Sequence, residues 1–198
     1  MNKVLSCIND LTTFMQTEVY ASLDDMTKAA LVRKKVELCC NYFLEIASNL
    51  NRNKYKGCYA PHKAVMIMAI MELVESRHIT ANVIHLDKEL KDKFKEVWQR
   101  VVPVESPFKC EYRNPFIYMD SEPFWDLSSD KDKAFITWEA LYAFSYEASR
   151  AVIKDHLLRS VKDDTISEQY NNDHPTINWM VAEDIMGIIP LIGLMIAG

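Results

Sequence analysis

Glycine and widespread basic charge are both scarce in this chain. Only 4 of its 198 residues are glycine. Neither GxGxxG nor GxxxxGK[ST] occurs, so we do not expect a backbone loop that holds nucleotide phosphates. The formal net charge of −5 excludes a surface that binds nucleic acid everywhere, but it leaves room for a local basic patch.

Residue spacings typical of metal sites and catalytic centres are also lacking. The chain has five cysteines and five histidines, with no CxxC pair. Cys58 and His62 lie four residues apart without a second such pair, so we expect no metal and no cofactor. The stretch 171–174, NNDH, lacks the paired histidines of a nuclease centre. We assign no catalytic residue, and the sequence favours a non-enzyme while leaving catalysis open.

A secretion signal and a long apolar run are lacking as well. The opening residues, MNKVLSCINDL, carry polar side chains throughout, so we expect a reduced, cytoplasmic protein with free thiols. The apolar stretch 185–198 is shorter than the roughly 20 residues of a membrane span, and Pro190 interrupts it. We expect no membrane association and predict that this tail packs on protein, either in this chain or in a second copy forming a homodimer.

Helical spacing dominates the first quarter of the chain. Apolar side chains recur every three or four residues from Asn2 to Tyr20 and again from Met26 to Leu50, which predicts an N-terminal helical hairpin in residues 1–53. Ser22, Asp24 and Asp25 are candidate caps of the second helix. The apolar stripe of that helix suits either a core face or a dimerisation seam; it comprises Val32, Val36, Cys39, Phe43, Ile46 and Leu50.

Residues 54–165 alternate between helical and extended patterns. We predict a helix from Pro61 to about Arg77, a short strand in HITANVIHLD, an amphipathic helix in DKELKDKFKEVWQRV and a short aromatic hairpin around DSEP in NPFIYMDSEPFWDLSS. A further helical segment starts at Ala134. This is the order of a winged-helix unit. The predicted fold is therefore α+β and mostly helical, with a winged-helix-like centre. Residues 166–198 are expected to form a linker and the apolar tail.

The segment from Asn51 to Lys63 is the main candidate for ligand binding. It has no acidic residue, and its four basic residues are Arg52, Lys54, Lys56 and Lys63. Such an island attracts phosphates in an otherwise acidic protein. Pro61 suits the start of a helix, where free N–H groups favour an anion. We therefore expect His62 and Lys63 at an exposed helix start that binds an anion, with Lys54, Lys56 and Lys63 supplying most of the affinity for phosphates. The alternative is that His62 caps its own helix and Lys63 is solvated.

Three segments together carry a family resemblance: GCYAPHKAVMIMAIMELVES, ITANVIHLDKELKDKFKEVW and NPFIYMDSEPFWDL. They resemble the N-terminal recognition domain of HNH-type, modification-dependent restriction endonucleases. That family includes the sulfur-binding domain that recognises phosphorothioate-modified DNA. The resemblance covers residues 55–161 and implies that His62 and Lys63 lie near the modified phosphate. It also implies a sulfur pocket around Pro115, with neighbours Arg113, Asn114, Phe116 and Tyr118.

The sequence departs from that family in two respects. Asn114 stands where the family has an aromatic residue before the proline, and no HNH nuclease part follows. The resemblance implies a non-catalytic DNA-recognition module of a bacterial restriction or defence system, which reads double-stranded DNA, modified or plain, beside a separate nuclease partner protein. The alternative is a structural or protein-interaction module with the same fold that has lost DNA binding. The candidate DNA-binding residues are Lys54, Lys56, His62, Lys63, Arg113, Asn114, Pro115 and Tyr118.

Overall fold

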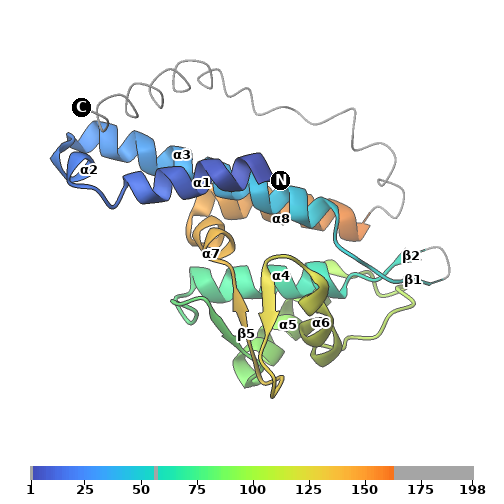
Figure 1. Ribbon diagram of the computed structural model, residues 1–198. Helices are drawn as coiled ribbons and strands as arrows, with labels where there is room; N and C mark the ends of the chain where they lie inside the picture. Colours follow the sequence, from blue (N-terminus) through green and yellow to red (C-terminus); the bar gives the residue numbers. More distant parts are fainter. Residues whose placement is uncertain (1, 56–57, 163–198) are drawn as a thin grey trace. The chain divides into compact units, whose positions relative to one another are not determined.

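The computed structural model describes residues 2–55 and 58–162, and in them the fold is α+β and mostly helical, as predicted. The helices are α1 (Asn2–Phe14), α2 (Glu18–Ser22), α3 (Asp25–Ser48), α4 (His62–Glu75), α5 (Lys88–Val101), α6 (Arg113–Tyr118), α7 (Trp138–Ser145) and α8 (Glu147–Lys162), with a 3₁₀ turn, η1 (Met119–Ser121). The strands are β1 (Lys54–Tyr55), β2 (Cys58–Tyr59), β3 (Val83–His85), β4 (Trp125–Leu127) and β5 (Lys133–Ile136) (Figure 1). The predictions for Lys56 and for residues 166–198 lie outside the described residues.

The N-terminal helical hairpin is confirmed, because α1 packs along α3 (Figure 1). Asp24 is the cap of α3, since its carboxylate accepts the backbone N–H of Thr27 at 2.9 Å. The first helix is shorter than predicted: it ends at Phe14, and Thr17 then caps the separate helix α2. The stripe on α3 is a core face over its second half, where Cys39, Phe43 and Ile46 are buried.

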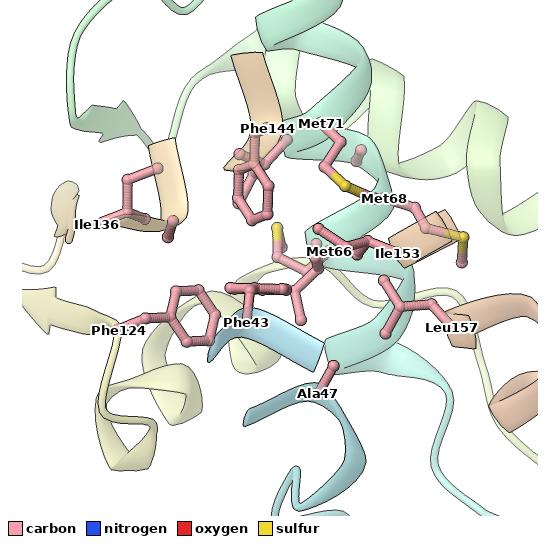
Figure 2. Packing of buried hydrophobic residues seen from close by; sticks show 14 of the residues in the cluster. Phe43, Ala47, Met66, Met68, Met71, Phe124, Ile136, Phe144, Ile153 and Leu157 are labelled. Atoms are coloured by element: carbon pink, nitrogen blue, oxygen red, sulfur yellow. The ribbon is translucent and has the colours of Figure 1, made fainter. Parts of the chain in front are cut away.

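Helix α4 is the centre of the core. Every residue from Lys63 to Met71 is buried, as expected for a helix that is apolar on all sides, and α4 packs against α5, α6, α7 and α8. Figure 2 shows Phe43 of α3 reaching the same cluster. Its ring meets those of Phe124 and Phe144 edge to face, with centroids 4.9 and 4.7 Å apart. The predicted N-terminal segment 1–53 thus contributes to the same hydrophobic core as α4.

A three-stranded antiparallel sheet with the order β3–β5–β4 lies in the second half of the described chain. The predicted short strand is β3, where Val83 pairs with Phe135 of β5. The order α4, β3, α5, α6, β4, β5 fits the winged-helix-like centre expected from the sequence.

The predicted hairpin around DSEP is wrong, as is the helical start at Ala134. The residues before and within DSEP form α6 and η1, and the hairpin pairs β4 with β5 instead. Two local causes favour helix α6: the Glu111 carboxylate accepts the first backbone N–H groups, and Pro115 stands in the first turn, where no N–H is needed. The hairpin turns near Lys131, which has a φ of 59°.

Candidate functional site

A pocket of about 520 Å³ lies at the start of α4. Its walls come from the segment between α3 and β1, from the start of α4, from the connection between α5 and α6, and from α6 with η1. The residues that line it are Asn51, Arg52, Asn53, Ala60, His62, Lys63, Phe108, Glu111, Asn114, Pro115, Tyr118 and Ser121. Most of the lining residues are polar, with aromatic side chains beside amide and charged ones.

Five of the eight predicted site residues line this pocket: His62, Lys63, Asn114, Pro115 and Tyr118. Helix α6 carries the last three of them. Pro115 lies in α6 and not in the hairpin to which the resemblance assigned it, because the local capping described above makes this segment helical.

Two more predicted residues, Lys54 and Arg113, are exposed and do not line the pocket. Arg113 directly precedes the lining residue Asn114. The Lys54 Nζ lies 4.9 Å from the centre of the Tyr59 ring, and the Arg52 guanidinium lies 5.1 Å from the same ring. Tyr59 therefore holds two cations near the pocket through its aromatic face.

Lys63 is not exposed, which overturns the expectation that it meets solvent at the helix start. It retains 8% of its accessible surface. Its Nζ donates to the Glu122 carboxylate and to the Ser121 Oγ at 3.0 Å. Glu122 is 5% exposed and also accepts the backbone N–H of Asn51 at 3.2 Å. Glu122 thus neutralises the charge of Lys63 beneath the pocket. The two residues are 59 positions apart in the chain, so no local sequence pattern could predict their contact.

His62 is half-buried and held on several sides. Its Nε2 donates to the backbone carbonyl of Lys109 at 2.8 Å, which fixes the tautomer because a carbonyl can only accept. The ring lies 4.7 Å from that of Trp98 and 5.8 Å, perpendicular, from that of Phe108. Burial lowers the pKa of His62 below its usual value. The ring is therefore neutral near pH 7, and it gains a charge only at lower pH than an unburied histidine does.

The start of α6 is closed by its own capping group. The two oxygens of Glu111 accept the backbone N–H groups of Arg113 at 2.9 Å and Asn114 at 2.7 Å. Asn114 and Tyr118 are then one helical turn apart on the same side of α6, and both line the pocket. Tyr118 retains 63% of its surface, so its ring is available to a ligand.

Sequence reasoning missed several lining residues. Phe108 and Glu111 lie in the irregular connection after α5, which has no periodic pattern. Asn51 and Asn53 lie on either side of Arg52, which the sequence analysis did name. Their place within the basic segment is the signal that could have identified them. Ser121 could not be found without knowing that it contacts Lys63.

No model of a protein family matches the chain, and no match is found among the curated proteins. Within residues 2–55 and 58–162, no three His, Cys, Asp or Glu side chains are grouped so as to hold a metal ion. In the same part of the chain, no helix combines the length and the apolar character needed to cross a membrane.

Proposed function

We propose that this chain is a non-catalytic module that recognises double-stranded DNA in a bacterial restriction or defence system, with a separate protein supplying the nuclease. The observation that carries the proposal is the gathering of five predicted site residues, from segments about 50 residues apart, around one pocket. The exposed cations Lys54 and Arg113 are next in sequence to residues that line the pocket. Local positive charge beside a shaped, partly aromatic pocket is the combination that DNA recognition uses.

The contacts divide into two kinds. Lys54 and Arg113 are exposed and are assigned to backbone phosphates, which supply affinity without reading sequence. Asn114 and Tyr118 on α6 are assigned to the bases, since an amide can pair with a base edge and a tyrosine ring can stack.

The resemblance to the sulfur-binding family supports a phosphorothioate as the modification that is read. A non-bridging sulfur is larger and less strongly hydrated than oxygen, so an apolar group beside a cation favours it. Pro115 is buried at the pocket wall, and the exposed Arg113 is two residues away in α6. This pair is the candidate for discriminating sulfur from oxygen.

Binding of a short labelled duplex, plain or carrying one phosphorothioate, tests the proposal by fluorescence anisotropy over a range of salt concentrations. Lys54→Ala and Arg113→Ala should each reduce the slope of log affinity against log salt by about 1. Lys3→Ala is the matched control, an exposed lysine on α1, and should leave the slope unchanged. If the unaltered protein binds neither duplex at low salt, the DNA-recognition proposal is refuted.

A second candidate function, protein interaction, is favoured by an aromatic row formed by Trp138 and Tyr142 of α7 and by Tyr146, which follows α7. Trp138 is 66% exposed, and Tyr142 and Tyr146 follow at four-residue spacing with their rings 5.1 Å apart. Trp138 and Tyr146 are exposed while Tyr142 is half-buried between them, and aromatic side chains are enriched at the centres of interfaces. With a second copy as the partner, sedimentation should show a dimer that Trp138→Ala converts to monomer. A monomer at all concentrations would exclude this self-association.

A further inference from the structure

We infer that the pocket at the start of α4 receives a nucleobase, a neutral flat ring read along its edge, and not a phosphate. One source of that base is a nucleotide extruded from a DNA duplex, and for this source the inference rests on the proposed function. A free nucleotide is the other source, and the two are separated by experiment below.

The charge balance of the pocket disfavours an anion inside it. Lys63 is committed to Glu122 and Ser121. Arg52, a second cation of the lining, donates from Nη1 to the carbonyl of Ser160 at 3.0 Å and lies over an aromatic ring. Arg52 keeps its positive charge, since a carbonyl and a ring do not neutralise it, but the Glu111 carboxylate also lines the pocket. A phosphate entering the pocket would lose water and meet this like charge, which is unfavourable.

The walls of the pocket suit a flat ring. Phe108, Tyr118 and His62 present aromatic surfaces. The His62 ring is fixed by its hydrogen bond to the Lys109 carbonyl and by its packing on Trp98, so one wall is ordered before any ligand arrives. Such side chains can stack on any base, because every base presents a π-face.

The remaining polar groups suit a base edge. Asn51, Asn53 and Asn114 line the pocket, and within the described residues their side-chain amides make no hydrogen bond. Each amide offers a donor beside an acceptor, the pattern that pairs with adenine. The volume of about 520 Å³ lies in the range of roughly 300–1,000 Å³ that holds small organic ligands.

Two exposed cations each directly adjoin a lining residue in the chain, Lys54 next to Asn53 and Arg113 next to Asn114. Lys54 on β1 and Arg113 at the start of α6 are exposed and outside the lining. An extruded base leaves its sugar and phosphates at the pocket mouth, while the ring is read inside by stacking and by hydrogen bonds to its edge. Exposed cations outside the pocket, with amide and aromatic groups among its lining, suit this arrangement.

The first experiment uses the full chain and a duplex carrying 2-aminopurine, whose fluorescence rises when the base leaves the stack. The expected result is a rise on binding that Tyr118→Ala and Asn114→Ala reduce. Asn9→Ala, an exposed asparagine on α1, is the matched control and should keep the full rise. Both pocket side chains are exposed, so melting temperatures should stay unchanged and a lost signal reports on the pocket.

The second experiment titrates adenosine monophosphate and inorganic phosphate separately by calorimetry. We expect the nucleotide to bind, phosphate not to compete, and Asn114→Ala to weaken nucleotide binding about tenfold. Nucleotide binding without any fluorescence rise on duplex would support the base pocket and assign it to free nucleotides. Duplex binding with no fluorescence rise and no nucleotide binding would overturn the inference while leaving DNA recognition intact. Equal competition by phosphate would also overturn it.

Discussion

Replacing Lys63 by methionine tests the buried ion pair beneath the pocket. The side chains of Lys63 and Glu122 retain 10% and 4% of their surface, so both charged groups are largely removed from water. Methionine keeps most of the apolar stem and deletes the ammonium. The Glu122 carboxylate then stays buried with the backbone N–H of Asn51 as its remaining described donor.

The magnitude follows from that orphaned carboxylate. Removing one partner of a buried ion pair costs about 3–5 kcal/mol, and in a chain of this size this corresponds to a fall in Tm of about 6–20 °C. The double variant Lys63→Met with Glu122→Gln carries no buried charge, and its amide oxygen still accepts from Asn51. It should recover most of the lost stability, because a neutral pair avoids the desolvation cost of ions.

Thermal melts and urea titrations of the three proteins measure this directly. The control is Arg159→Met, which removes a cation from the exposed pair with Asp155, where the side chains retain 50% and 59% of their surface. That change should cost less than about 1 kcal/mol. If Lys63→Met is as mild as the control, or if the double variant is no more stable than the single one, the buried pair does not stabilise the fold as argued.

Three other changes probe the core, the thiols and the pocket histidine. Phe43→Ala should lower the free energy of unfolding in urea by about 3–5 kcal/mol, because its ring is fully buried; a loss under about 1 kcal/mol would contradict this packing. Burial raises the pKa of the Cys39 thiol to about 12 and also raises that of Cys40. A thiol reagent at about pH 8 should therefore label the exposed Cys110 before Cys39 and Cys40, and labelling of Cys39 ahead of Cys110 would refute the assignment. Since burial lowers the pKa of His62, the unfolded chain takes up a proton first as the pH falls below about 6.5, and the folded state loses stability there. Melts of His62→Gln between about pH 7 and 5 should show a smaller loss, and an identical pH dependence would exclude this role.

The sequence by itself determined the features that depend on neighbouring residues. Apolar side chains on all sides of residues 64–71 required a buried helix, and α4 is that helix. The polar residues before a helical repeat predicted where α3 starts, and Asp24, one of three candidates, is its cap. β-branched residues predicted the strand at Val83. Each of these signals acts within one or two turns, where propensity, capping and periodicity decide the structure.

Only the tertiary structure decided which groups meet at the site. The aromatic run before DSEP suits a strand or a helix equally, and the capping carboxylate of Glu111 selected the helix. His62 and Asn114 were predicted as site residues, yet their shared pocket also needs Phe108 from an irregular connection. The sequence predicted Lys63 as an exposed cation, whereas in the structure it forms a buried ion pair with Glu122. A charged side chain is expected at the surface unless it is paired, and distant chain segments supply that pair only when the core brings them together.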